Sequence, residues 1–438
     1  MNTSRERLAS IIDAALEAVE PGGAVRAVLA RRGRALLAGG RDFPVAGHLL
    51  VAALGKAAVP MARAALAICG DLVTGGLAVT HARPAGLERL GPLPAREAGH
   101  PLPDHRSAEA GRELASLAAE AGSGDLILAL LSGGGSALAA LPAEGLEPGD
   151  LSATTDALLR GGASIEELNA VRGHLSAISG GHLARLAAPA AVLVLALSDV
   201  PGDRPNVIAS GPFSPDPTTF GDALAVIERR CPGRVPPRVA AHLERGARGG
   251  IPETPKPGAA AFDGVSWHLV GSGAIAAAAA AARAAAIGYE AEVAPVVLRG
   301  EAREAGRRLA AEVRELAERG RAACRVWHGE TAVTVTGGGA GGRNQELILA
   351  AALELDGADG VLLAAMGTDG RDGPTDAAGG VADGGTVGRI RASGLDPEAL
   401  LCDNDANRAL AAAGDLLVTG PTGTNVADLV VALVGGRV

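Results

Sequence analysis

The sequence predicts an α/β protein with two domains. Its 438 residues exceed the usual size of one domain. Along the chain, apolar runs of strand length alternate with helical stretches, and a passage rich in proline, glycine and arginine interrupts this rhythm near residues 250–258. Near-continuous apolar strands separated by helices are typical of parallel sheets covered on both faces. We therefore expect βαβ units throughout the first half of the chain.

The first predicted domain spans residues 1–250. Its apolar runs predict strands at residues 48–54, 77–80, 125–131 and 191–197. Amphipathic spacing predicts helices at residues 10–19, 57–68 and 107–121, and a helix-rich passage at residues 151–185.

The second predicted domain spans residues 258–438. Strands are expected at residues 267–270, 292–297, 332–336 and 361–365, and helices at residues 274–286, 301–318 and 344–355. The stretch between the two domains contains Lys256 in a Thr-Pro-Lys-Pro-Gly segment, which we interpret as a stiff, exposed linker.

Composition narrows the class of function. Apolar residues make up 48% of the chain, and 40 basic against 49 acidic residues give a net charge of −9. A nucleic-acid groove or an anionic membrane surface would require the opposite sign, so we expect a small-molecule partner, with no nucleic acid and no membrane. Four scattered cysteines encode neither a disulfide framework nor a zinc site, and Asp13 and Glu17 interrupt the apolar run that a secretory signal needs. We expect a cytoplasmic protein.

Lys56 is a candidate for chemistry because lysine is nearly absent. The chain contains only two lysines, Lys56 and Lys256, so arginine serves almost everywhere else. A compact ammonium differs from a planar guanidinium as a phosphate ligand and in its pKa. Lys56 directly follows a predicted strand, where open α/β sheets bind ligands, and a cation at a helix start is otherwise unfavourable.

Two further strand ends in the first domain carry candidate residues. Ser132, Gly133, Gly134, Gly135 and Ser136 follow the strand at 125–131, and such a glycine turn can present consecutive N–H groups to a phosphate. Asp199 follows the strand at 191–197. A carboxylate there can hold Mg²⁺ or act as a base, although aspartate is also common in ordinary turns.

The second domain carries a longer glycine loop and an aspartate cluster. Residues 337–342 include five glycines and lead into Arg343, Asn344 and Glu346, where an arginine is suited to bidentate anion binding. Asp369 is the first of three aspartates after the strand at 361–365, a pattern that fits Mg²⁺ or a solvated acidic turn.

One motif supports a different function. Gly271, Gly273 and Ala276 follow a predicted strand and open a helix, and Glu290 lies 19 residues after Gly271. This is the outline of a dinucleotide-binding fingerprint. It makes a nicotinamide-dependent reductase the alternative function.

Taken together, the chain resembles the glycerate 2-kinase family, whose members carry an N-terminal Rossmann-like domain followed by a MOFRL domain and are often labelled hydroxypyruvate reductase. The motifs occur in family order over nearly the whole chain. The matching stretches are residues 53–57, 99–104, 131–136, 169–172, 198–203, 208–212, 215–219, 341–346, 367–370, 404–405 and 419–426.

The resemblance implies ATP- and Mg²⁺-dependent phosphorylation of D-glycerate to 2-phosphoglycerate, in a cleft between the domains. It makes Lys56 and Arg343 the leading catalytic residues, steadying the glycerate carboxylate and the transferring group, with residues 132–136 holding nucleotide phosphates. Candidate metal ligands are Asp199 and Asp369. The substrate-binding or cleft residues implied are Asp199, Asn344, Glu346, Asp369 and Asn404. The choice of the 2-hydroxyl rests on the resemblance alone, and a homodimer stays open.

The chain also departs from the family pattern. Gly173, Ser179 and Gly339 stand where relatives usually carry basic residues. Each lost charge-assisted hydrogen bond would weaken anion binding by about 1.5–3 kcal/mol. A divergent kinase acting on another small hydroxy acid is therefore a further alternative, and a non-catalytic binding protein is a third.

Overall fold

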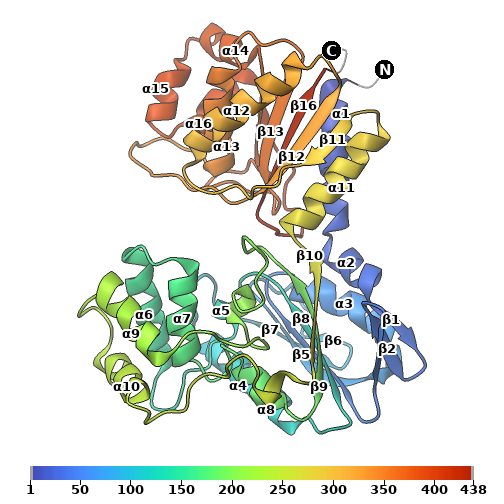
Figure 1. Cartoon of the computed structure of the whole chain (residues 1–438), viewed down its shortest axis with the longest axis vertical. Coiled ribbons are helices and arrows are strands. Elements are labelled where there is room, and N and C mark those ends of the chain that lie inside the picture. Colours follow the sequence, from blue (N-terminus) through green and yellow to red (C-terminus); the bar gives the residue numbers. More distant parts are fainter. Residues whose placement is uncertain (1–2, 436–438) are drawn as a thin grey trace. The chain divides into compact units, whose positions relative to one another are not determined.

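The structure, a computed structural model, describes residues 3–435; residues 1–2 and 436–438, at the outer ends of the predicted domain ranges, lie outside it. Contacts between Cα atoms divide the chain into two compact units (Figure 1). The N-terminal unit is Pro21–Val270. The C-terminal unit begins at Gly271 and also includes the first helix, α1 (Ser4–Ala18). Both units are α/β, which confirms the predicted fold class.

The N-terminal unit is built on a seven-stranded sheet in the order β10-β9-β8-β4-β5-β7-β6. β4 pairs in parallel with β5 and β8, and β8 pairs in parallel with β9. The strands of this sheet are β4 (Leu49–Leu54), β5 (Val73–Thr80), β6 (Arg89–Leu90), β7 (Leu93–Glu97), β8 (Leu126–Leu131), β9 (Ala191–Leu197) and β10 (Val265–Gly271). A small antiparallel sheet consists of β1 (Ala30–Arg32), β2 (Ala35–Ala38) and β3 (Arg41–Pro44).

The structure confirms the four strands predicted for this unit. Their sequences are almost continuously apolar because these strands have no exposed face. Every residue of β8 is buried, and so is nearly every residue of β4 and β9. Such strands bury both faces beneath helices, as parallel sheets require. The helices are α2 (Pro21–Val28), α3 (Ala58–Cys69), α4 (His105–Glu120), α5 (Gly135–Leu138), α6 (Pro148–Arg160), α7 (Ile165–Leu175), α8 (His182–Ala187), α9 (Phe220–Arg230) and α10 (Pro237–Ala247).

Helices α6, α7, α9 and α10 form a separate layer within the N-terminal unit (Figure 1). They enclose their own core, which includes Leu158, Val171 and Phe220. At its start, α7 is fixed by a capping box: Ser164 accepts from the N–H of Glu167, and the Glu167 carboxylate accepts from the N–H of Ser164. This small core holds α7 in place beside the main sheet.

The C-terminal unit contains a six-stranded sheet in the order β11-β12-β16-β13-β14-β15. Only β11 and β12 are parallel; β16 pairs antiparallel with both β12 and β13. The strands are β11 (Glu290–Val293), β12 (Ala323–Gly329), β13 (Val361–Gly367), β14 (Gly379–Asp383), β15 (Leu416–Leu417) and β16 (Asp428–Val434). Besides α1, the helices are α11 (Gly273–Ala286), α12 (Ala302–Glu318), α13 (Arg343–Glu354), α14 (Thr386–Ala392), α15 (Pro397–Cys402) and α16 (Ala406–Ala413).

One predicted strand is wrong. Residues 333–336 are β-branched and alternate in polarity, yet residues 332–336 form a single bridge between Ala332 and Glu301 and otherwise no strand. The Glu301 carboxylate accepts from both the N–H and the hydroxyl of Thr334, at 2.9 and 3.0 Å, and so takes the place of a neighbouring strand. This part of the chain forms its strand a few residues earlier, as β12.

The stretch around Lys256 packs against the N-terminal unit instead of lying exposed. The Lys256 ammonium donates to the Thr218 carbonyl and to the Thr254 hydroxyl, and pairs with Glu253 at 3.1 Å. The Asp216 N–H donates to the Pro255 carbonyl. These bonds explain why the compact units separate at Val270, whereas composition placed the predicted boundary at residues 250–258. The interpretation of Lys256 as exposed is wrong.

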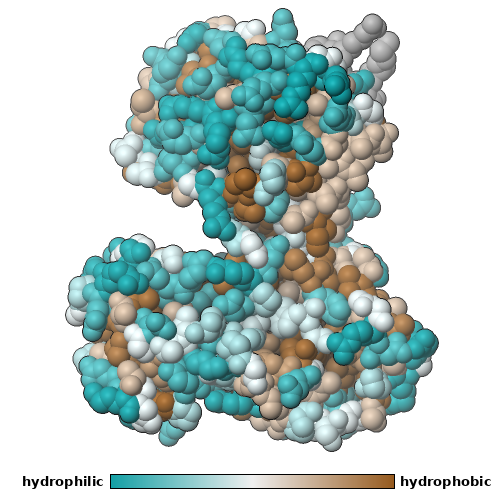
Figure 2. Space-filling view, in the orientation of Figure 1, coloured by the Kyte–Doolittle hydropathy of each residue, from teal (hydrophilic) through white to brown (hydrophobic). Residues whose placement is uncertain are grey.

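Figure 2 shows hydrophilic residues over most of the visible surface of each unit, with hydrophobic residues in smaller patches. Among the described residues, no helix is both long and apolar enough to cross a membrane.

Candidate functional site

Three neighbouring strands of the N-terminal unit end in predicted site residues. Lys56 follows β4, the glycine turn 132–136 follows β8, and Asp199 follows β9. The chain leaves β4 through α3 to β5 on one side, and later returns to β8 on the other side. The gap between β4 and β8 is therefore the switch point of the sheet, where open α/β sheets bind ligands.

Lys56 is joined to the glycine turn through its backbone. Its N–H donates to the Gly133 carbonyl at 2.9 Å. No carboxylate among the described residues pairs with its ammonium. Two histidines lie near it: burial and then the Lys56 charge lower the pKa of His81, and the same causes lower the pKa of His100 to about 4. Both rings are neutral at pH 7, so Lys56 is the cation of this group.

The glycine turn leaves its backbone donors unused. The N–H groups of Gly133, Gly134, Gly135 and Ser136 donate to no described residue. Gly134 has a left-handed φ of 85°, and a Cβ there would stand 3.0 Å from His100 and 3.3 Å from Lys56. Consecutive N–H groups of this kind form an anion-binding concavity.

Ser132 has a structural part in the same turn. Its buried hydroxyl accepts from the Ala57 N–H at 3.0 Å. A Cβ on Gly55 would stand 2.1 Å from the Ser132 hydroxyl oxygen, so only glycine allows β4 and β8 to end this close together. Ser132 therefore fixes the turn, while the N–H groups of the four residues after it have no partner among the described residues.

Asp199 abuts the turn. A Cβ on Gly133 would stand 1.9 Å from one Asp199 carboxylate oxygen, so this carboxylate lies directly against the Gly133 backbone. Asp199 is not free, because it takes part in at least one polar or electrostatic interaction. The structure thus brings together Lys56, the glycine turn and Asp199.

Arg343 begins α13 in the C-terminal unit, and its guanidinium is already paired. Nε and Nη2 donate to the Asp428 carboxylate at 2.6 and 2.9 Å, and Nη1 lies 2.8 Å from Glu330. Burial opposes the charge on Arg343, but Asp428 and Glu330 raise its pKa above the usual value. Burial raises the pKa of Asp428 to about 6.

Asn344, Glu346 and Asn404 hold the second glycine loop. The Asn404 side-chain oxygen accepts from the N–H groups of Thr336 and Gly337, and its amide donates to Glu346 at 2.8 Å. Asn344 donates through its side chain to Asp428 at 3.1 Å. All three side chains are buried, and the bonds that the structure gives them are structural.

Asp369 lies in a tight turn after β13. One of its carboxylate oxygens accepts from the Arg371 N–H at 3.0 Å. Among residues 3–435, no group of three or more histidine, cysteine or acidic side chains is placed to hold a metal ion. Asp199 and Asp369 are therefore single carboxylates, each of which could contribute to a site completed by other ligands.

The dinucleotide fingerprint lacks its structural context. The strand before it, β10, belongs to the seven-stranded sheet, whereas the helix after it, α11, and the next strand, β11, belong to the C-terminal unit. A nucleotide-binding βαβ unit needs both strands in one sheet. In addition, a Cβ on Gly273 would stand 2.9 Å from the His328 ring, so the turn is closely covered.

Sequence reasoning missed Arg172 as a site residue. It lies on α7 and lines a cavity that also contains Ser136. The available signal was its place at the end of residues 169–172, one of the stretches that match the family pattern.

Comparisons with known proteins agree with this architecture. Residues 7–244 match the family model described as a domain of unknown function, DUF4147, and residues 323–428 match the MOFRL family. The chain is 41% identical over 434 residues to a glycerate 2-kinase of Pyrococcus horikoshii, covering 98% of this chain and 96% of that protein. The chain belongs to the glycerate kinase family.

Other members of the glycerate kinase family support the same assignment. A D-glycerate 2-kinase of Thermotoga maritima is 41% identical, covering 88% of this chain and 91% of that protein. The crystal structure of a glycerate kinase from Thermotoga maritima has a TM-score of 0.86 at 40% identity, covering 98% of this chain and 99% of that one. A protein of Agrobacterium vitis named putative hydroxypyruvate reductase is 40% identical, covering 99% of this chain and 95% of that protein. The predicted family is confirmed.

Proposed function

We propose that this kinase transfers the γ-phosphoryl group of ATP to the 2-hydroxyl of D-glycerate and so forms 2-phosphoglycerate. The names of its relatives in Pyrococcus horikoshii and Thermotoga maritima support the reaction. The observation that carries it is the unpaired ammonium of Lys56 beside a glycine turn with four unused N–H donors. Phosphoryl transfer needs positioning and charge neutralisation, and these groups supply both.

The glycine turn would hold phosphate oxygens. Its N–H groups match the acceptors of a phosphate, and a lysine at the same strand edge offsets the negative charge. The two neutral histidines beside Lys56 add no negative charge that would compete with the nucleotide. This accounts for a cationic site in a chain whose net charge is −9.

Mg²⁺ fits the site as a partner of the nucleotide. Mg²⁺ commonly binds through one or two carboxylates together with substrate phosphates, and when bound it neutralises phosphate charge. Asp199 lies against the Gly133 backbone and would supply one such carboxylate. Asp369 is the second candidate; its turn lies in the C-terminal unit.

Arg343 would contribute through the outer edge of its guanidinium. Its Nη1 pairs with Glu330, whose side chain is 42% exposed, whereas its inner edge is held by buried Asp428. An anionic ligand could replace the exposed partner without disturbing the buried one. That Arg343 and Lys56 act in one cleft stays a prediction, as do a cytoplasmic location and a homodimer.

One plate assay tests the proposal. Purified protein with Mg²⁺, ATP and D-glycerate is read for ADP release, and phosphorus NMR of the product identifies the hydroxyl. In parallel, NADH or NADPH with hydroxypyruvate is read for loss of nicotinamide absorbance. We expect ADP release that depends on glycerate. Nicotinamide turnover alone would overturn the kinase proposal, and binding without ADP formation would indicate a non-catalytic protein.

A further inference from the structure

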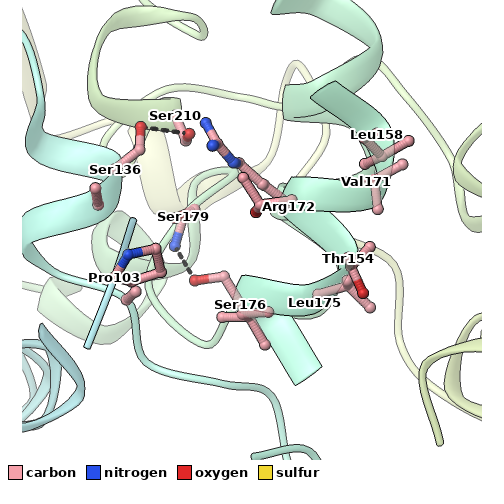
Figure 3. A pocket seen from close by; sticks show the side chains of 14 residues that line it. Pro103, Ser136, Thr154, Leu158, Val171, Arg172, Leu175, Ser176, Ser179 and Ser210 are labelled. Carbon is pink, nitrogen blue, oxygen red and sulfur yellow. Dashed lines mark hydrogen bonds between the residues drawn. The ribbon is translucent and has the colours of Figure 1, made fainter. Parts of the chain in front are cut away.

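A cavity of the N-terminal unit lies beyond the glycine turn, between α7 and the helix that follows the turn (Figure 3). Four serines, Ser136, Ser176, Ser179 and Ser210, line it together with Arg172. Its volume is about 30 Å³, which is room for about two water-sized groups. A carboxylate fits such a space, and a purine ring does not.

Arg172 is a cation without a counterion. Its neighbours on α7, Val171 and Leu175, belong to the core of the helical layer, so α7 is held firmly while Arg172 reaches into the cavity. Figure 3 shows its guanidinium pointing toward the end where Ser136 and Ser210 lie. No described residue forms a hydrogen bond or ion pair with it, and burial lowers its pKa to about 10. It is still charged at pH 7, and a half-buried charge is unfavourable until an anion pairs with it.

A chain of hydrogen bonds fixes the direction of the protons at this end of the cavity. The Asn169 side-chain amide donates to the Val207 carbonyl, so its oxygen accepts from the Ser210 hydroxyl at 2.8 Å. The single proton of Ser210 is thereby used, and Ser136 must donate to Ser210 across 2.6 Å. The Ser136 oxygen keeps its lone pairs and is an acceptor toward the cavity.

The opposite wall supplies donors. The Ser176 hydroxyl oxygen accepts from the N–H groups of Ile178 and Ser179 at 3.2 and 3.0 Å, which leaves its own proton to donate. The Ser179 hydroxyl has no partner among the described residues. The Arg172 guanidinium, which points toward the end where Ser136 and Ser210 lie, adds donors that suit the two oxygens of a carboxylate.

The backbone beneath Ser210 is strained. Ala209 and Ser210 both have left-handed φ values, 51° and 58°, although neither is glycine. A Cβ on Gly135 would stand 2.7 Å from the Ala209 methyl group, so this strained segment packs directly on the glycine turn. Strain of this kind persists where surrounding structure enforces it, often at ligand sites. It couples the cavity to the turn that we assign to phosphate.

We propose that Arg172 binds the carboxylate of the hydroxy-acid substrate and that Ser136 accepts a hydrogen bond from its 2-hydroxyl. The inference rests on the proposed function and adds the part of the site that selects an acid. A 2-hydroxy acid carries its hydroxyl on the carbon next to the carboxylate, and in this cavity the Arg172 guanidinium points toward the end where the Ser136 acceptor lies. The acceptor belongs to the same turn that carries the unused N–H groups, so the reacting hydroxyl lies next to the phosphate.

Steady-state kinetics of Arg172→Gln test the inference. We expect the KM for D-glycerate to rise about 10- to 100-fold, because a charge-assisted pair is lost, while the KM for ATP changes less than twofold. Arg172→Lys keeps the charge but loses the planar, two-pronged guanidinium, so its KM for D-glycerate should lie between those of the unmodified enzyme and Arg172→Gln. The matched control is Arg160→Gln on α6, an exposed arginine paired only with Asp156, which should leave both KM values unchanged.

Glycerol, in which a hydroxymethyl group replaces the carboxylate, provides a second measurement. The unmodified enzyme should prefer D-glycerate to glycerol strongly, and Arg172→Gln should lose most of that preference. A rise in the KM for ATP with an unchanged KM for glycerate would show that the cavity binds nucleotide phosphate, and would overturn the inference. If Arg172→Gln does not fold, the same KM values and the same preference for D-glycerate over glycerol are measured in Arg172→Lys.

Calorimetric binding of D-glycerate separates this inference from the proposed function. If the unmodified chain releases no ADP with glycerate, the proposed function fails. Binding that is present in the unmodified chain and at least tenfold weaker in Arg172→Gln would still support the cavity. Equal binding by the two proteins would overturn it.

Discussion

The two glycine loops have similar compositions and opposite hydrogen bonding. In the N-terminal unit, the turn at 132–136 keeps four N–H groups free, and the nearby Lys56 has no ion pair with a described residue. In the C-terminal unit, the backbone N–H groups of residues 336–340 all donate, in turn, to oxygens of Asn404, Asp403 and Asp405. Glycine in the first loop presents the backbone to a ligand. In the second loop it allows the backbone to pack against the protein itself.

The same contrast holds for the two cations. Lys56 forms no ion pair with a described residue, whereas Arg343 forms two, one of them with buried Asp428. A residue that is free in the folded chain can be removed without structural cost, and a residue that neutralises a buried charge cannot. We therefore expect substitutions in the first region to change turnover, and substitutions in the second to change stability as well.

The largest effect is expected for Lys56→Ala. Turnover of D-glycerate should fall by about three orders of magnitude, because electrostatic stabilisation of the transferring group is lost. The melting temperature should change by less than about 2 °C, since Lys56 makes no ion pair among the described residues.

Lys256→Ala is the matched control, because the chain has no third lysine. It should retain turnover within twofold and lose about 1 kcal/mol of unfolding free energy with its bonds to Thr218 and Thr254. Near-normal turnover in Lys56→Ala would remove this lysine from the mechanism.

Arg343→Ala should lower both turnover and stability. It leaves the Asp428 carboxylate buried without its partner, which we expect to cost about 2–3 kcal/mol of unfolding free energy, less than a fully buried pair because Arg343 is 34% exposed. Urea unfolding measures the loss, and adding Asp428→Asn should recover part of it. A stability equal to that of Lys56→Ala would contradict the contrast between the two cations.

Gly134→Ala tests the first loop against the second. A methyl group at this left-handed position would press on His100 and Lys56, so kcat/KM should fall about 10- to 100-fold. The control is Gly338→Ala in the second loop, where a Cβ meets nothing within 4 Å and the N–H bond to Asp403 is retained. It should stay within twofold of the unmodified enzyme, and equal losses in the two variants would show that neither loop is specialised.

The two regions also differ in how much of their structure can be predicted from the sequence. Strand ends identified Lys56, the glycine turn and Asp199, because parallel strands bring their carboxyl ends to one edge and the apolar runs located each strand closely. The order of those strands was not needed for this inference. Local pattern was therefore sufficient for the N-terminal candidates.

It was not sufficient in the C-terminal unit. There the sheet is mixed, and β16 at its centre was not predicted, so Asp428 at the start of β16 was not recognised as the partner of Arg343. That pairing joins residues 85 positions apart. Arg172 was missed for a related reason: the sequence around an arginine on a helix does not show whether an acidic side chain from a distant part of the chain pairs with it.

The smallest expected effect is an opposite response of the two units to acid. In the N-terminal unit, burial lowers the pKa of His100 to about 4 and of His182 to about 3. Between pH 7 and 5 the unfolded chain binds protons at these histidines and the folded chain does not, so stability falls as the pH falls. The loss is on the order of 2 kcal/mol for buried His182 and smaller for half-buried His100, where solvent screens the charge. In the C-terminal unit, the pKa of Asp428 is raised to about 6, so the folded state binds the proton first and stability rises as the pH falls, by about 1 kcal/mol.

The two tryptophans make this measurable, because Trp267 lies in the N-terminal unit and Trp327 in the core of the C-terminal unit. Urea unfolding of the full chain, followed by fluorescence in Trp327→Phe and in Trp267→Phe, reports each unit separately. We expect the midpoint seen by Trp267 to fall between pH 7 and 5, and that seen by Trp327 to rise slightly. His100→Gln should reduce the first slope and leave the second unchanged. If the two urea midpoints changed with pH in the same direction, the titrating charges of the two units would be coupled. The contrast between the two regions would then not include their response to pH.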